Sequence, residues 1–243
     1  MINFRKFFES RFYNDTLNQR FWSDSKEFDT EVRDKLLTIA MDVASAAGVE
    51  NLVEDVQLTG SLSNFNYTDF SDLDTHILLD FKDINADEDL VKRALDGKRF
   101  IWNLRHDINI GGHTVEIYFQ DIHEPHKASG LYSLLKDEWI TEPNYKEPVV
   151  DERDVTAKAD KIKGEISDLE MAHQTASIED LIFLQKSANA LRRKISKMRK
   201  DSLDADGEFG IGNLAFKELR NSDFIERLID ITNKLYDDQF SSQ

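Results

Sequence analysis

Two short apolar segments, one ending in Gly60-Ser61 and the other following Asp72-Leu73-Asp74, constrain the fold of this chain most strongly. Residues 55–59 and 74–81 have the pattern of two β-strands, and ten residues separate the Gly-Ser pair from Asp72. Side chains alternate between the faces of a strand, so Asp72 and Asp74 are expected to point the same way. Two carboxylates about 4 Å apart repel by roughly 4 kcal/mol at an effective dielectric constant of about 20. A divalent cation relieves this repulsion, and hard oxygen ligands favour Mg²⁺ or Mn²⁺.

A third carboxylate lies in a predicted β-hairpin further along the chain. Residues 107–110 and 113–119 flank a Gly-Gly pair, which is the pattern of two strands joined by a two-residue turn. In the second strand, Glu116 lies on the face opposite the apolar side chains of its neighbours. With this strand beside the Asp74 strand, Glu116 joins the two aspartates around one pocket. Three such carboxylates can hold two metal ions for phosphoryl or nucleotidyl transfer.

Gly60 and Ser61 supply the other half of this predicted site. Glycine lets the backbone approach a phosphate closely, because it has no side chain. The N–H groups of the turn and the Ser61 hydroxyl can then bind phosphate oxygens. We therefore predict that Gly60 and Ser61 bind the phosphates of a nucleotide.

These residues together resemble the signature of the DNA polymerase β-like nucleotidyltransferase superfamily, with residues 30–122 as the catalytic core. The resemblance implies a nucleoside triphosphate substrate such as ATP, magnesium ions, and transfer of a nucleoside monophosphate with release of pyrophosphate. It implies that Asp72 and Asp74 hold both metal ions, while Glu116 holds the ion that activates the acceptor and takes the acceptor's proton. Small-substrate members often have a further Gly or Arg soon after the Gly-Ser pair, whereas residues 63–67 here read Ser-Asn-Phe-Asn-Tyr. The resemblance therefore leaves the acceptor open.

The pattern of apolar residues predicts an α+β fold: a nucleotidyltransferase-type mixed β-sheet with flanking helices, followed by a C-terminal helical bundle. We expect a catalytic domain over residues 1–142, a linker over 143–150 and a helical domain over 151–243. Helical spacing of apolar residues predicts helices over 29–47 and 88–103.

Two further local patterns predict helices near the ends of the chain. The phenylalanines of the first two dozen residues predict a short helix with an aromatic face packed on the core; they are Phe4, Phe7, Phe8, Phe12 and Phe21. Ser177 and Asp180 resemble a capping box at the start of a long helix. A segment rich in Asp and Gly, residues 201–212, predicts a break before the last helices.

The segment that follows the Glu116 strand could contact a nucleotide. Lys127, Ser129 and Tyr132 come soon after that strand, where a triphosphate or a base could lie. The alternative is a connecting loop and a short helix without a binding role. His123 and His126, together with Glu124, could be metal ligands. Because the sequence positions no further ligand beside them, the preferred interpretation is that these histidines are solvated in a loop.

A basic segment stands out in the acidic chain, which has a formal net charge of −16. Residues 186–200 contain seven basic side chains and no acidic ones, and Lys186 and Arg193 are predicted to project away from the apolar seam of their helix. One interpretation is a wall that contacts phosphates, either of the triphosphate or of an RNA acceptor. The other interpretation is a solvated face of the helix.

Composition and charge narrow the function classes. The negative charge argues against broad, non-specific nucleic-acid binding, because phosphate backbones require a basic surface. No apolar run approaches the roughly 18 residues of a membrane span, and the absence of cysteine fits a cytoplasmic location. We lean towards an RNA 3′ end as acceptor, on the basic segment alone; a protein, a small molecule or a second nucleotide are also compatible. Two alternatives to an enzyme are an inactive nucleotidyltransferase-like module that binds nucleotide or regulates, and a plain Ca²⁺ or Mg²⁺ site. The oligomeric state is not predicted.

Overall fold

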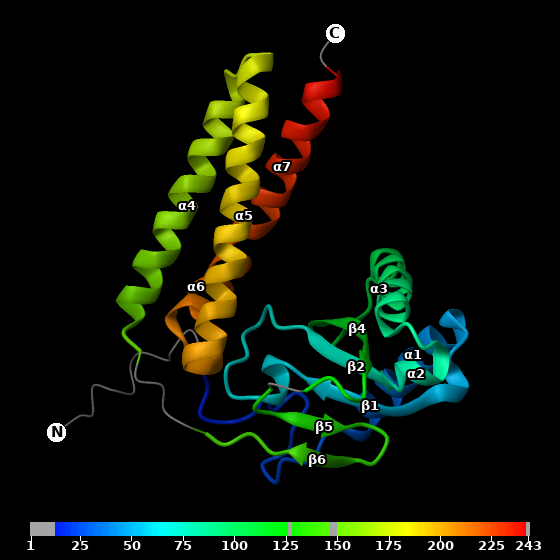
Figure 1. Cartoon of the computed structure of the whole chain (residues 1–243). Helices are drawn as coiled ribbons and strands as arrows, with labels where there is room; N and C mark the ends of the chain where they lie inside the picture. The colour runs from blue at the N-terminus through cyan, green and yellow to red at the C-terminus, as the bar shows by residue number, and fades with distance from the viewer. Residues whose placement is uncertain (1–12, 126–127, 146–149, 242–243) are drawn as a thin grey trace, which may run out of the picture. The chain divides into compact units, whose positions relative to one another are not determined.

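The chain forms two compact units, residues 1–146 and 147–243. The computed structural model describes residues 13–125, 128–145 and 150–241. The first unit contains a β-sheet with helices, and the second is helical (Figure 1). The predicted α+β class with a C-terminal helical region is therefore confirmed. Of the predicted linker, residues 143–145 and 150 have neither helix nor strand, and residues 146–149 lie outside the described part.

Within the described residues, six strands form one mixed sheet in the order β3–β4–β2–β1–β5–β6. They are β1 (Val53–Thr59), β2 (Leu73–Leu79), β3 (Asn109–Ile110), β4 (His113–Asp121), β5 (Leu131–Ser133) and β6 (Glu138–Thr141). β2 runs parallel to β4 and antiparallel to β1, and the remaining neighbours are antiparallel. The predicted hairpin is confirmed, because β3 and β4 pair across Gly111 and Gly112.

The sheet has one apolar and one polar face, because side chains alternate along each strand. The buried apolar side chains of the three central strands include Val56, Leu58, Leu73, Ile77, Leu79, Val115 and Ile117. They form one core with the buried side chains of α1 (Thr30–Ala47). Each fully buried side chain of this kind contributes about 1.5–3 kcal/mol to folding. The opposite face carries polar side chains, among them Gln57, Thr59, Asp74, His76, Glu116 and Tyr118.

Local capping explains where the two long helices of the first unit begin. Asp29 accepts a hydrogen bond from the backbone N–H of Val32 at 2.9 Å, and Asp87 accepts one from Leu90 at 3.0 Å. These caps start α1 and α3 (Glu88–Arg105), as the sequence predicts to within two residues at each end. α3 packs against β4, where the Asn103 side chain exchanges two hydrogen bonds, of 3.2 and 3.3 Å, with the backbone of Ile117.

Three local predictions for the first unit are wrong. β2 ends at Leu79, because Asp80 caps the short helix α2 (Phe81–Ile84). Residues 131–141 form the β5–β6 hairpin instead of a loop and short helix, because Leu131–Ser133 extend the sheet beside β1. No helix forms within residues 13–28, where Phe21 is nevertheless buried in the core as predicted; Phe4, Phe7, Phe8 and Phe12 lie outside the described residues.

The second unit consists of α4 (Glu152–Gln174), α5 (Ile178–Asp206), η4 (Gly207–Phe209), α6 (Ile211–Asn221) and α7 (Phe224–Ser241). α5 packs against α4, α6 and α7. The predicted break at residues 201–212 begins too early, because α5 continues to Asp206. The hydroxyl of Ser202, in the last turns of α5, accepts hydrogen bonds from the N–H groups of Gly212 and Asn213 at 3.0 and 3.2 Å. This contact joins the end of α5 to the start of α6.

Ser177→Ala should lower the stability of the second unit by about 1 kcal/mol, because it removes the side-chain cap of α5. The predicted capping box is present: Ser177 caps the N–H of Asp180, and the Asp180 carboxylate accepts the N–H of Ser177 at 3.0 Å. Thermal unfolding followed by far-UV circular dichroism measures the loss. Ser196→Ala, an exposed change in the middle of α5, is the control and should cost nothing, since alanine favours helix. Equal melting temperatures for the two variants would contradict the assignment of the cap.

In the part of the chain that the structure describes, no helix combines the length and the apolar character that crossing a membrane requires.

Candidate functional site

The candidate site begins with two carboxylates on neighbouring strands. β2 and β4 pair in parallel with Asp74 directly opposite Glu116, so both side chains lie on the polar face of the sheet. Both residues are half-buried. The predicted meeting of the Asp74 and Glu116 strands is therefore found in the structure.

Asp72, unlike this pair, lies outside the strands. The ladder between β2 and β4 begins with Leu73 and Val115, so Asp72 lies just before the paired region. Within the described residues, no group of three or more His, Cys, Asp or Glu side chains is arranged to hold a metal ion. Of the expected gathering of Asp72, Asp74 and Glu116 around one pocket, the structure shows that Asp74 and Glu116 are paired on neighbouring strands, and the backbone ladder does not extend to Asp72.

Gly60 is pressed against the Asp74 carboxyl group. Its backbone has φ of 76° and ψ of −161°, a region that is essentially open to glycine alone. A Cβ atom at this position would lie 2.0 Å from Asp74 Oδ2. The chain therefore needs glycine here for two reasons, the backbone conformation and the close approach to the carboxylate.

The Ser61 hydroxyl ties the turn to the segment that leads into β2. It donates a hydrogen bond to Ser71 Oγ at 2.7 Å, and Ser71 Oγ also accepts the N–H of Thr68 at 2.9 Å. Ser71 directly precedes Asp72. A phosphate that took the Ser61 hydroxyl, as predicted, would have to replace this bond.

Tyr118 is a member of the site that was not predicted from the sequence. Its hydroxyl donates a hydrogen bond to Glu116 Oε2. Burial raises the pKa of Tyr118 well above its usual value, and the hydrogen bond to Glu116 and the charges of Glu116 and Asp74 raise it further. The sequence alone could have placed Tyr118 on the same face as Glu116, because residues i and i+2 of a strand share a face.

Of the three residues after β4 that were predicted to contact a nucleotide, the structure describes two. Ser129 is exposed, and its hydroxyl accepts a hydrogen bond from Asn64 Nδ2 at 2.7 Å. Lys127 lies outside the described residues.

The structure places Tyr132 apart from the two carboxylates. Tyr132 pairs with Leu58 in the sheet, so its side chain lies on the apolar face, away from Asp74 and Glu116. It is 3% exposed, its ring meets that of Trp22 edge-on at 5.1 Å, and its hydroxyl donates to Asp137 at 2.7 Å. A one-residue difference in register decides which face a strand residue takes.

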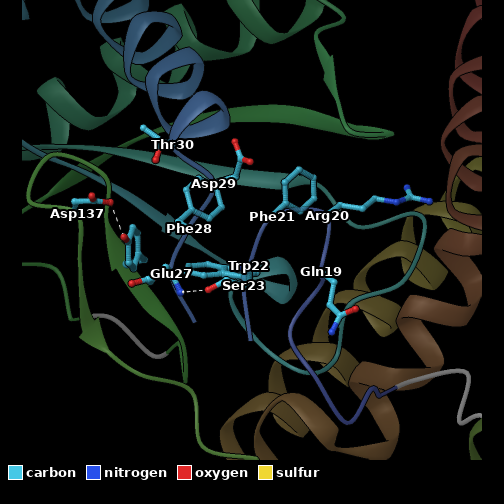
Figure 2. A pocket seen from close by; sticks show the side chains of 11 residues that line it. Gln19, Arg20, Phe21, Trp22, Ser23, Glu27, Phe28, Asp29, Thr30 and Asp137 are labelled. Carbon is cyan, nitrogen blue, oxygen red and sulfur yellow. Dashed lines mark hydrogen bonds between the residues drawn. The ribbon is translucent and has the colours of Figure 1, made fainter. Parts of the chain in front are cut away.

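A pocket of about 650 Å³ opens beside the start of α1 (Figure 2). Aromatic side chains, including Trp22 and Phe28, and polar side chains, including Arg20 and Asp29, line it together. None of Asp72, Asp74 and Glu116 belongs to its wall. This pocket is therefore separate from the pair of carboxylates.

The basic segment lies on α5 in the second unit, and its side chains are exposed as predicted. Lys194 pairs with Glu165 and Lys197 with Asp201, both at 2.7 Å. Lys186 and Arg193 form no ion pair with any residue that the structure describes.

Comparison of the chain with protein-family models, curated proteins and solved structures gives no match. The function is therefore inferred from the residues and their geometry.

Proposed function

We propose that the chain is a metal-dependent nucleotidyltransferase that moves a nucleoside monophosphate from a nucleoside triphosphate to an acceptor hydroxyl. The observation that carries the proposal is the placement of Asp74 beside Glu116 on the polar face, with the Gly60 backbone against the Asp74 carboxylate. The proposal includes a sheet of the nucleotidyltransferase type. The spacing of Gly60-Ser61 and Asp72-Leu73-Asp74 in the sequence suggests this type. A cytoplasmic location agrees with the absence of cysteine.

The proposal includes Mg²⁺ or Mn²⁺, which Asp74 and Glu116 would hold together with Asp72, the residue that directly precedes β2. Carboxylate oxygens are the ligands that these hard cations prefer, and two neighbouring carboxylates gain from a cation between them. When bound, the metal neutralises charge on the phosphates and the leaving pyrophosphate.

The residues of the chain then have distinct roles in the transfer. The acceptor oxygen bonds to the α-phosphorus, the bond from that phosphorus to the bridging oxygen breaks, and pyrophosphate leaves. Glu116 takes the proton of the acceptor hydroxyl at a carboxylate oxygen. Gly60 lets backbone N–H groups approach the phosphates, and Ser61 exchanges its bond to Ser71 for a phosphate oxygen.

The test is incubation of the full chain with each α-³²P-labelled nucleoside triphosphate and Mg²⁺, with and without total RNA. We expect label in an acceptor and equimolar pyrophosphate with at least one triphosphate. Label in RNA identifies RNA as acceptor, whereas label in the protein fraction or in a small molecule identifies those acceptors. Absence of pyrophosphate with every triphosphate and every acceptor would refute the proposal.

A second candidate function is binding of a nucleoside triphosphate without turnover. It is favoured by the hydrogen bond that already occupies Glu116 and by the position of Asp72 outside the strand ladder. Equilibrium dialysis with the same labelled nucleotides separates the two functions, because a binding module retains the nucleotide and releases no pyrophosphate.

Arg193→Glu should weaken RNA binding and make it less dependent on salt, if RNA is the acceptor. Each phosphate contact that is lost lowers the slope of log K against log salt by about 1. Binding of free triphosphate should be unchanged. The measurement is fluorescence anisotropy with labelled RNA at several salt concentrations.

The control for this prediction is Lys158→Glu, an equal change of charge at an exposed position of α4 outside the basic segment. It should have a smaller effect on RNA binding. If Arg193→Glu instead impairs triphosphate binding, the basic segment belongs to the nucleotide site.

A further inference from the structure

Tyr118 contacts Glu116 directly and shares its face of β4. The two residues are separated by Ile117, whose side chain is buried on the other face. The Tyr118 hydroxyl is the donor of the bond to Glu116 Oε2. A tyrosine hydroxyl has an O–H group to donate, whereas an ionised carboxylate only accepts.

The Tyr118 ring is held by neighbours from two elements. The ring of His76, opposite Tyr118 in the β2–β4 ladder, lies 4.9 Å from it between centroids, at an interplanar angle of 33°. The Arg99 guanidinium, from α3, lies over the Tyr118 ring with its central carbon 4.6 Å from the centroid. A side chain held in this way has few rotamers open to it.

Both neighbours are themselves anchored. His76 Nδ1 is 2.6 Å from Gln120 Oε1, on the same face of the sheet. α3 is joined to the backbone of β4 by the two hydrogen bonds between Asn103 and Ile117. The position of the Tyr118 hydroxyl is therefore set by the sheet and by α3 together.

We propose that Tyr118 is a positioning residue that orients the Glu116 carboxylate towards Asp74 for metal binding. This inference rests on the proposed function and deepens it. A glutamate side chain has several rotamers, and a bond to one carboxylate oxygen reduces their number before the ion arrives. The other oxygen of Glu116 stays available to the ion. Outer-shell partners of this kind typically change metal affinity or activity by about 10- to 100-fold when removed.

Tyr118→Phe tests the proposal, because it removes the hydroxyl and keeps the ring that Arg99 and His76 contact. The probe is Mn²⁺, added to the metal-free full chain and followed by the electron paramagnetic resonance signal of free Mn²⁺. We expect the dissociation constant for Mn²⁺ to rise about 10- to 100-fold. In turnover assays, the Mg²⁺ concentration for half-maximal rate should rise by a similar factor, while KM for the nucleotide changes little.

The matched control is Tyr145→Phe, which also removes a hydrogen bond from a tyrosine hydroxyl to a carboxylate. Tyr145 donates to Asp15 at 3.1 Å and packs on Phe65, away from the Asp74–Glu116 pair. Its Mn²⁺ affinity should equal that of the wild type. Arg99→Gln, which removes the stacked guanidinium, provides a second variant and should weaken Mn²⁺ binding in the same direction but less.

The outcomes separate this inference from the proposed function. Unchanged or tighter Mn²⁺ binding by Tyr118→Phe, with wild-type binding lost in Asp74→Asn, would overturn the role of Tyr118 and leave the carboxylate site standing. No Mn²⁺ binding by the wild type would overturn both. Weaker binding in Tyr118→Phe and normal binding in Tyr145→Phe would support the proposal.

Discussion

Asp74→Asn is expected to abolish nucleotidyl transfer while the protein stays folded. The carboxamide cannot supply the charge that a divalent cation needs between Asp74 and Glu116. Metal ions contribute several kcal/mol to stabilising the transition state of such reactions, so the rate should fall by about a thousandfold or more. The measurement is release of pyrophosphate from the preferred triphosphate.

The stability of the metal-free Asp74→Asn protein, in contrast to its activity, should not fall. Without metal, Asp74 and Glu116 are neighbouring carboxylates on half-buried positions, and the substitution removes one of the two like charges. We therefore expect the melting temperature of the metal-free protein to stay the same or to rise slightly.

Asp83→Asn is the control for this prediction, since Asp83 is exposed on α2 and lies outside the site. It should retain full activity. Full activity of Asp74→Asn would remove the proposed enzyme, whereas its unfolding would show that Asp74 has a structural role.

Gly60→Ala should impair both folding and activity. The backbone conformation of Gly60 costs a non-glycine residue about 1–3 kcal/mol. In addition, the new methyl group would lie 2.0 Å from Asp74 Oδ2, so the carboxylate or the turn has to move. Because the carboxylate is proposed to bind metal, we expect loss of turnover together with the loss of stability.

Gly207→Ala separates the cost of the backbone conformation from the cost of the contact with Asp74. Gly207 has nearly the same backbone angles, φ of 69° and ψ of −156°, but a methyl group added there would have no neighbouring atom within 4 Å among the described residues. This variant has only the cost of the backbone conformation and should keep full activity.

Unfolding of the first unit is followed by tryptophan fluorescence, because all three tryptophans lie in it, and unfolding of the helical unit by far-UV circular dichroism. A fully active Gly60→Ala that loses no more stability than Gly207→Ala would contradict the close contact.

Much of the sheet could be predicted from local pattern. The alternation of apolar and polar residues in 113–119 identified both the strand and the face of Glu116, and the Gly-Gly pair identified the turn before it. The capping pattern of Ser177 and Asp180 marked the start of α5, because its hydrogen bonds join residues three apart, and the helical spacing of apolar residues marked α1.

Other features of the site could not be predicted in this way. Tyr132 was assigned to the nucleotide site from its position after β4, but its face depends on its register with β1. The contact between Arg99 and Tyr118 depends on α3 packing along β4, and the position of Asp72 depends on where the β2–β4 ladder begins.

Residue order alone thus determined which side chains share a face of each strand and where helices begin, because these properties follow from backbone geometry over a few residues. The order of the strands, and therefore which carboxylate, tyrosine or arginine lies beside which, was decided by the tertiary structure. Those neighbours come from segments far apart in the chain, and burying the apolar face of the sheet against α1 is what brings them together.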